Sequence, residues 1–338
     1  MLARGCLAAL FAALIVIVAP ALVWHGLSVE AQATAGQLLA PAGGQAAWLD
    51  LQAPRPRMLT QLPPPAYVAE IAAAPGSPRA ALVVVSPFGG QGTPGGDIVS
   101  LDLRSGALAP LVPRSAETES LTGPMWLPDG TTLVFQREDL SVVGESYAGM
   151  SRPVYPSRIE LARTDTGRSV VIGSGRQPAP APDGSGLVFV RTTREGTAML
   201  VRSPLDGEEQ VLIPQGTYLD IASPRYAPQG DRIAFMVPEN PVSGSLVDQV
   251  GQLLGLEPVY AHGFPWDLWI MNKDATGVHR LAQLAADDGT VSWSPDGREL
   301  FVHGGTGSFL VDATSGDVTP LTFIAGYGTS TWLPDSDS

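Results

Sequence analysis

One short segment of the sequence has the residue types of a nucleophilic hydrolase site. Residues 142–150 read VVGESYAGM and place Ser146 among glycines after an aliphatic pair. A serine acts as a nucleophile when a strand delivers it into a strained turn and a helix follows, because the turn exposes its hydroxyl beside backbone N–H groups. The chemistry would be acyl transfer, with a histidine as the general base.

The six letters GESYAG, residues 144–149, resemble the nucleophile signature of serine carboxypeptidases. The resemblance implies a hydrolase with Ser146 as its nucleophile. The following residues argue against it, because Pro153 and Pro156 forbid the helix that the elbow requires. Downstream, His279 falls in a regular outer-strand position of the repeats described below. We therefore predict that Ser146 is an ordinary loop residue and that the chain has no catalytic residue.

The rest of the sequence supplies no second set of catalytic or metal-ligating residues. No cluster of His, Cys and carboxylates has metal-ligand spacing, and no glycine-rich loop follows a strand and opens a helix. Residues 89–97, GGQGTPGGD, are rich in glycine but join two expected strands. Cys6 is the only cysteine and precedes an apolar run, so the exported portion has neither a disulfide nor a thiol nucleophile. We expect no metal and no cofactor.

The overall composition limits the class of partner. The 338 residues include 33 acidic and 20 basic side chains, which give a formal net charge of −13. A nucleic-acid partner is not expected, because phosphate binding needs a basic surface. Hydrophobic residues make up 44% of the chain, enough for a large core, while 38 glycines and 31 prolines favour many short strands and turns over long helices.

Residues 1–35 have the features of a targeting segment and a short linker. An apolar run covers residues 7–24, and the letters AQA at residues 31–33 offer a cleavage site between small side chains. The run is long for a signal peptide and barely long enough to span a membrane. A cleaved signal peptide and a retained membrane anchor therefore both stay open. Either one places the remaining chain outside the cytoplasm, as a secreted, periplasmic or membrane-tethered protein.

A motif built around proline, aspartate and glycine recurs along the rest of the chain. MWLPDGTTLVF begins at Met125, and similar segments follow as APAPDGSGLVF, RYAPQGDRIAF and SWSPDGRELFV. A fifth copy, TWLPDSDS, ends the chain, and a degenerate copy, AAAPGSPRAALVVV, precedes the others. The six anchoring prolines are Pro75, Pro128, Pro182, Pro228, Pro295 and Pro334.

Each copy predicts a tight turn that leads into a half-buried strand. Proline presets φ at the first corner of the turn, aspartate tolerates the second, and glycine supplies positive φ. Apolar residues such as Leu133 and Phe135 then alternate at period two. Four copies have an aromatic residue two positions before the proline, which we expect to pack between repeats. These residues are Trp126, Tyr226, Trp293 and Trp332.

The strands that follow each copy complete a larger repeated unit. Two more strand-like segments, joined by a turn with glycine, give four antiparallel strands, the content of a propeller blade. The last copy provides one strand, whereas residues 36–62 provide three strands with no copy ahead of them. Joining these ends completes a sixth blade and removes the exposed edges of an open sheet. We predict that residues 36–338 form an all-β, six-bladed β-propeller of four-stranded antiparallel blades, with the last blade closed by N- and C-terminal strands.

These repeats resemble the WD40-like PD40 repeats of TolB-like six-bladed propellers. SWSPDGRELFV and DLWIMNKDATGVHRL are especially typical, and the resemblance extends from Gly36 to the C-terminus. It implies a propeller that is used mainly for protein or ligand binding in periplasmic or surface settings. TolB itself has an additional N-terminal α/β domain, for which the residues between the leader and Gly36 leave no room. The resemblance is therefore to the propeller family and not to TolB itself.

Two long insertions interrupt the repeats, at about residues 137–157 and 237–265. Both join the second strand of a blade to the third, so the alternation of antiparallel strands brings both to one face of the disc. Elaborated loops on a rigid scaffold commonly serve binding, and decoration without function is the alternative. The second insertion also contains an apolar stripe over residues 246–254, which predicts a short amphipathic helix.

An aromatic and polar segment, VYAHGFPWD, follows this expected helix and contains four candidate binding residues. They are Tyr260, His262, Phe264 and Trp266, of which the last also fits the start of a third strand. We predict a non-enzymatic, monomeric propeller that binds a protein or a small ligand and meets the membrane only through its N-terminal segment. The alternative is a lactonase-like or hydrolase-like propeller enzyme with its site at the channel mouth or on the insertion face.

Overall fold

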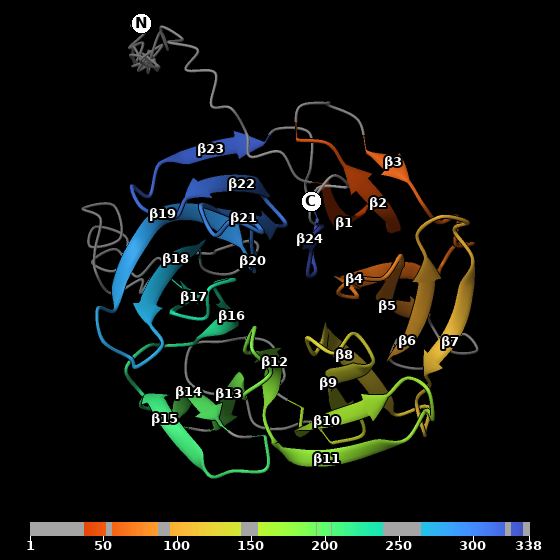
Figure 1. The fold of residues 1–338 in the computed structure, drawn as a ribbon, viewed down its shortest axis with the longest axis horizontal. Helices are drawn as coiled ribbons and strands as arrows, with labels where there is room; N and C mark the ends of the chain where they lie inside the picture. The colour runs from red at the N-terminus through yellow and green to blue at the C-terminus, as the bar shows by residue number, and fades with distance from the viewer. Residues whose placement is uncertain are drawn as a thin grey trace, which may run out of the picture. The chain divides into compact units, whose positions relative to one another are not determined.

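The computed structural model describes residues 37–51, 56–86, 95–142, 155–193, 195–203, 205–238, 265–321 and 326–333. These residues form six four-stranded antiparallel sheets. The sheets stand around a common centre, each with one strand nearest the centre and one at the rim (Figure 1). The predicted six-bladed propeller is confirmed. No helix occurs among the described residues, and therefore none that is long and apolar enough to cross a membrane. The expected targeting segment lies outside them.

Each of the first five blades takes four consecutive strands, named here from the centre outward. Blade 1 is β4 (Tyr67–Ala73), β5 (Arg79–Ser86), β6 (Gly95–Asp102) and β7 (Leu108–Val112), and blade 2 is β8 (Glu119–Trp126), β9 (Thr132–Asp139), β10 (Ser157–Arg163) and β11 (Ser169–Ser174). Blade 3 is β12 (Arg176–Pro180), β13 (Leu187–Thr193), β14 (Gly196–Arg202) and β15 (Glu209–Ile213). Blade 4 is β16 (Ala222–Tyr226), β17 (Arg232–Pro238), β18 (Pro265–Asn272) and β19 (His279–Asp287), and blade 5 is β20 (Thr290–Trp293), β21 (Glu299–Gly304), β22 (Gly307–Asp312) and β23 (Val318–Leu321).

Blade 6 joins the two ends of the propeller, as the sequence predicted. Its strands, from the centre outward, are β24 (Thr331–Leu333), β1 (Gln37–Ala42), β2 (Gln45–Leu49) and β3 (Arg57–Met58). β24 and β1 pair antiparallel, with Trp332 opposite Leu38. The backbone N–H of Ile71 in blade 1 also donates to the carbonyl of Thr329 at 3.2 Å. The ring therefore closes through strand pairing within blade 6 and a hydrogen bond from blade 1 to blade 6.

The Pro-Asp-Gly motif forms the turn between the first and second strands of a blade. In blade 2, Asp129 Oδ1 accepts the backbone N–H groups of Thr131 and Thr132 at 2.8 and 2.7 Å. Gly130 has a φ of +62°, which favours glycine at this corner. The turn thus fixes the register between strands by short-range hydrogen bonds.

The core consists of apolar side chains from the second strand of each blade and aromatic residues that link neighbouring blades. Phe135 and Phe235 are no more than 1% exposed on their second strands. Trp126 Nε1 donates to the carbonyl of Ala72 in blade 1 at 3.0 Å. Trp293 Nε1 donates to the carbonyl of Arg225 in blade 4 at 3.1 Å. The prediction that the aromatic residue before the repeat proline packs between blades is confirmed for these two tryptophans.

The two insertions leave the propeller where the second strand of a blade turns into the third. One connects β9 to β10 in blade 2, and the other connects β17 to β18 in blade 4. The predicted helix and most of the first insertion, Ser146 included, lie outside the described residues. The turn between β1 and β2 in blade 6 occupies the equivalent position. Because strands alternate in direction, the innermost strands also begin on this side of the propeller, which we call the insertion face.

Candidate functional site

A cavity of about 510 Å³ lies where the innermost strands begin, at the insertion-face end of the central channel. Five of the six blades contribute to its described lining. The lining consists of Tyr67, Val68, Ala69 and Glu70 from blade 1, Gln177 from blade 3, Ala222 from blade 4, Asp288, Gly289 and Thr290 from blade 5, and Pro41, Gly43, Gly44, Gly326, Tyr327 and Gly328 from blade 6. We call it the channel-mouth cavity.

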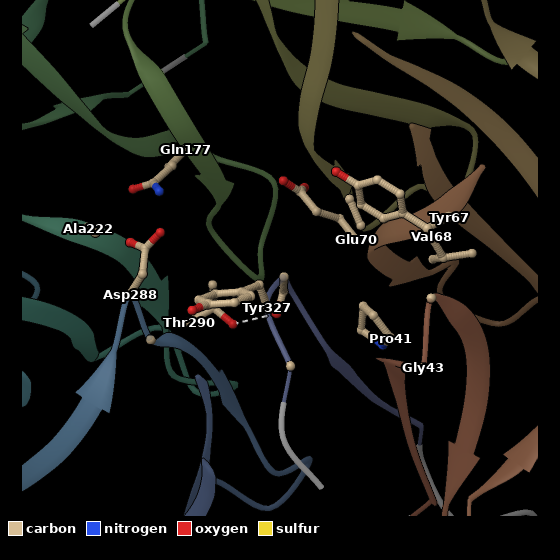
Figure 2. Close-up of a pocket in the computed structure, with 15 residues that line it drawn as sticks. Pro41, Gly43, Tyr67, Val68, Glu70, Gln177, Ala222, Asp288, Thr290 and Tyr327 are labelled. Atoms are coloured by element: carbon tan, nitrogen blue, oxygen red, sulfur yellow. Dashed lines mark hydrogen bonds between the residues drawn. The ribbon is translucent and has the colours of Figure 1, made fainter. Parts of the chain in front are cut away.

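Three polar side chains reach the same open space from different blades. Glu70 comes from β4, Gln177 from β12, and Asp288 from the turn between β19 and β20 (Figure 2). Gln177 and Asp288 have φ angles of +52° and +49°, a backbone conformation that is uncommon for residues with a side chain. Such strained positions persist where surrounding contacts hold them, and they cluster at binding sites.

Interblade hydrogen bonds hold the wall of the cavity in place. In blades 2 to 4 a bulge interrupts the innermost strand, and Gly123, Gln177 and Ser223 take left-handed φ angles at that bulge. Each bulge residue directs its N–H toward the preceding blade. Gly123 donates to Glu70 Oε2 at 2.6 Å, Gln177 to Gln136 Oε1 at 2.9 Å, and Ser223 to Gln177 Oε1 at 2.8 Å. Glu70 and Gln177 thus join neighbouring blades and also face the cavity.

The electrostatic environment of Glu70 differs from that of an ordinary surface carboxylate. Burial raises the pKa of Glu70 from 4.5 to about 7. The N–H of Gly123 and the charge of Arg225 oppose this rise in pKa, while the charge of Glu138 adds to it. Arg225 is 7% exposed and donates from Nη1 to the carbonyl of Pro224 at 2.8 Å. Burial lowers the pKa of Arg225 to about 10, so it stays charged at neutral pH, whereas Glu70 is divided between its two protonation states.

Two exposed tyrosines complete the cavity on the side of blades 1 and 6. Tyr67 is 43% exposed and Tyr327 is 54% exposed, and both lie at the cavity in Figure 2. The hydroxyl of Tyr327 donates to Asp287 Oδ2 at 2.8 Å, and this hydrogen bond raises the pKa of Tyr327. Aromatic rings with a polar tip supply apolar contact area and orienting hydrogen bonds together. This wall can therefore contact the apolar part of a ligand.

The candidate residues that the sequence indicated fall elsewhere or outside the described residues. Tyr260, His262 and Phe264 lie outside them. Trp266 is the second residue of β18, is 4% exposed, and belongs to a hydrophobic cluster with Leu268. Its side chain is therefore part of the core rather than of a surface patch.

The other two histidines of interest are described, and neither lines the cavity, although His303 is buried next to the lining residues Pro41 and Gly326. His279 begins β19, and its Nδ1 lies 2.8 Å from the carbonyl of Gly277. His303 is fully buried in β21, where its Nδ1 is 2.8 Å from Ser308 Oγ, and burial lowers its pKa to about 4. Among the described residues, no group of three or more His, Cys, Asp or Glu side chains is placed to hold a metal ion.

Sequence reasoning did not single out the polar residues of the channel mouth. Their sequence signal is a position five residues before the repeat proline, which is polar in five of six copies and glycine in the other. The residues at this position are Glu70, Gly123, Gln177, Ser223, Thr290 and Thr329. Alignment of the copies on their prolines would have revealed this ring of residues, although not which of them face the cavity.

Comparison with known proteins supports the fold. No family model and no curated protein matches the sequence. The structure is similar to TolB from Acinetobacter baumannii, with a TM-score of 0.61 and 16% identity over 89% of this chain and 67% of that chain. It is also similar to a chain of a nidogen–laminin complex, with a TM-score of 0.60 and 12% identity over 87% of this chain and 98% of that chain. A putative TolB from Agrobacterium tumefaciens gives a TM-score of 0.57 and 14% identity over 85% of this chain and 87% of that chain. At these identities the similarity concerns the fold alone.

Proposed function

We propose that this protein is a non-enzymatic, extracytoplasmic binding module of the TolB-like type, and that the channel-mouth cavity is its binding site. The observation that carries the proposal is the cavity itself, in which four blades direct polar and aromatic side chains into about 510 Å³. Cavities of roughly 300–1,000 Å³ with a few convergent polar groups are typical of small-molecule sites. The PD40-like repeats and the apolar run at residues 7–24 support the family and the location, respectively.

The rigidity of the wall supports binding as the role of this cavity. Glu70 and Gln177 are fixed by hydrogen bonds to the next blade, so their polar atoms are positioned before a ligand arrives. A preorganised site loses less conformational entropy when it binds, which favours affinity. The exposed rings of Tyr67 and Tyr327 add contact area within the same cavity at little entropic cost.

Selection from a random peptide display library on the purified propeller tests this proposal. We expect enriched peptides to lose binding to Tyr67→Ala, because Tyr67 is exposed in the cavity, whereas Val211→Ala, on the outermost strand of blade 3, leaves binding unchanged. Melting temperatures of both variants control for folding. Peptides that bind the Tyr67 variant and the native protein equally would place the binding site elsewhere, and the absence of any enriched peptide would contradict the proposal.

A propeller enzyme is a second candidate, which the electrostatics of Glu70 support. A carboxyl group with a pKa near 7 in a cavity has the properties of a general acid or base. A panel of fluorogenic esters and lactones, assayed with the native protein and with Glu70→Gln, distinguishes the two candidates. Turnover by the native protein that disappears in the variant would replace the binding proposal with an enzymatic one.

A further inference from the structure

The charged side chains in the described lining of the channel-mouth cavity are all acidic. The lining contains two carboxylates, Glu70 and Asp288, and neither Lys, Arg nor His. Two more carboxylates lie close to lining residues. The charge of Glu138 raises the pKa of Glu70, and Asp287 accepts a hydrogen bond from the hydroxyl of Tyr327. Arg225 is the described cation that acts on Glu70, and its side chain is buried beneath the wall. The negative charge of the wall thus exceeds the positive charge near it, which favours a cationic ligand and disfavours an anionic one.

The aromatic wall is consistent with a cation on an aliphatic chain. Tyr67 and Tyr327 expose 43% and 54% of their surfaces at the cavity. Aromatic faces attract ammonium and guanidinium groups and also pack against alkyl chains. A carboxylate lies beside each ring, since Glu70 shares β4 with Tyr67 and Asp288 follows the hydrogen-bond partner of Tyr327 (Figure 2). These carboxylates supply charge-assisted hydrogen bonds, which are stronger than neutral ones. The cavity can therefore hold the chain of such a ligand against a tyrosine ring and its charge against the neighbouring carboxylate.

We propose, on the basis of the proposed function, that the channel-mouth cavity binds an organic cation, an ammonium or guanidinium group on an aliphatic chain, with Glu70 and Asp288 as its anionic partners. The cation belongs either to a free alkylamine or to a basic side chain of a polypeptide. Among the described residues the cavity opens toward the insertion face, so a polypeptide can deliver a single side chain while its backbone stays outside.

Binding of a cation at this site is coupled to the protonation of Glu70. The groups that act on Glu70 are the N–H of Gly123 from β8, Arg225 from β16 and Glu138 from β9, with Asp288 across the cavity. Only the ionised form of Glu70 attracts a cation strongly, and its pKa of about 7 makes that form a minority at pH 6 and a majority at pH 8. The apparent affinity scales with the competent fraction, so we expect binding about tenfold weaker at pH 6 than at pH 8.

Fluorescence polarisation with two pairs of probes tests the inference. The first pair is dansylcadaverine, a primary alkylamine, and its N-acetylated derivative. The second pair is an end-blocked, labelled pentapeptide with one lysine and its acetyl-lysine counterpart. We expect the charged member of at least one pair to bind at least tenfold more tightly than its acetylated counterpart. Binding of the amine alone, or of the peptide alone, identifies the source of the cation.

Variants connect this binding to the cavity. Glu70→Gln retains an oxygen that can accept the N–H of Gly123 but removes the charge, so we expect loss of the pH dependence and at least tenfold weaker binding at pH 8. Asp288→Asn weakens binding independently, and serves if Glu70→Gln does not fold. Glu208→Gln, an exposed residue in the turn between β14 and β15, removes the same charge on the opposite side of the disc and leaves binding unchanged.

The outcomes separate this inference from the proposed function. Equal binding of charged and acetylated probes, a pH dependence that survives in Glu70→Gln, or no binding of either charged probe would each overturn the cation inference. If neutral peptides from the display selection nevertheless require Tyr67, the binding site stands and only its ligand class is wrong. If no selected peptide depends on Tyr67, the proposed function itself fails.

Discussion

Replacement of Glu70 by glutamine should change how the stability of the propeller depends on pH. Burial raises the pKa of Glu70 from 4.5 to about 7, so the folded protein holds this proton more tightly than the unfolded chain does. The contribution of Glu70 to stability is therefore complete below pH 4.5 and is lost as the pH rises through 7. The glutamine of the Glu70→Gln variant is neutral throughout this range, so the variant does not lose stability through ionisation at this position.

The two pKa values give the size of the effect. Linkage between proton binding and unfolding predicts that ionisation of Glu70 removes about 2.5 kcal/mol from the free energy of unfolding between pH 5 and pH 8. Other titrating groups respond in the same way in both proteins, including Glu209, whose pKa is lowered to about 2. Arg225 stays charged across this range, and its attraction for ionised Glu70 is already contained in the pKa of about 7, so it adds no separate term to the difference between the two pH values.

Urea denaturation of both proteins at pH 5 and pH 8 measures this effect. The free energy of unfolding of Glu70→Gln minus that of the native protein should be larger at pH 8 than at pH 5 by about 2.5 kcal/mol. Glu208→Gln, with its exposed carboxyl, serves as the control and should show no such change. A difference for Glu70→Gln that is the same at both pH values would refute the argument that burial in the channel mouth governs this carboxyl group.

Three further predictions concern the ring and the hydrolase-like motif. Trp126→Phe should lower the free energy of unfolding by about 1 kcal/mol through loss of the bond to blade 1, and an unchanged urea midpoint would contradict this. Gly328→Ala should prevent closure of the propeller ring, because the added Cβ would lie 1.6 Å from the carbonyl oxygen of Ala69. The control Gly123→Ala, whose Cβ would be 3.7 Å from its nearest atom, should fold at a cost of about 1 kcal/mol. Far-UV circular dichroism distinguishes the unfolded variant from the folded one. A fluorophosphonate probe should label neither the native protein nor Ser146→Ala, and labelling of the native protein alone would make Ser146 a nucleophile.

The fold was predictable because its information is local and repeated. Each Pro-Asp-Gly turn fixes a hairpin through contacts within a few residues, as Asp129 does with two following N–H groups. The strand that follows buries a phenylalanine such as Phe135 or Phe189 at the same register position. Because the same turn and strand recur in six copies, the sheets can be arranged in few ways. The pairing of β24 with β1 was predictable for the same reason, since each end of the chain held part of a blade.

The channel-mouth cavity was not predictable in this way, because it depends on how the closed ring is assembled. Glu70 and Asp288 belong to blades 1 and 5, and they face one cavity only once blade 6 has closed between them. The left-handed bulges at Gln177 and Ser223 have no strong local signal, since neither residue favours positive φ. These bulges turn N–H groups toward the preceding blade and so decide which side chains are held at the channel.

The predicted insertion face and the channel-mouth cavity belong to one surface. The insertions follow the second strands of blades 2 and 4, and the turn between β1 and β2, which lines the cavity at Gly43 and Gly44, occupies the same position in blade 6. Innermost strands begin on that face as well, because strand direction alternates from the centre outward. A partner that contacts the insertions is therefore on the side from which the cavity is entered. If the proposed binding function holds, the length of an insertion on this face can change the affinity for a polypeptide, while the lining of the cavity separately determines which side chain fits.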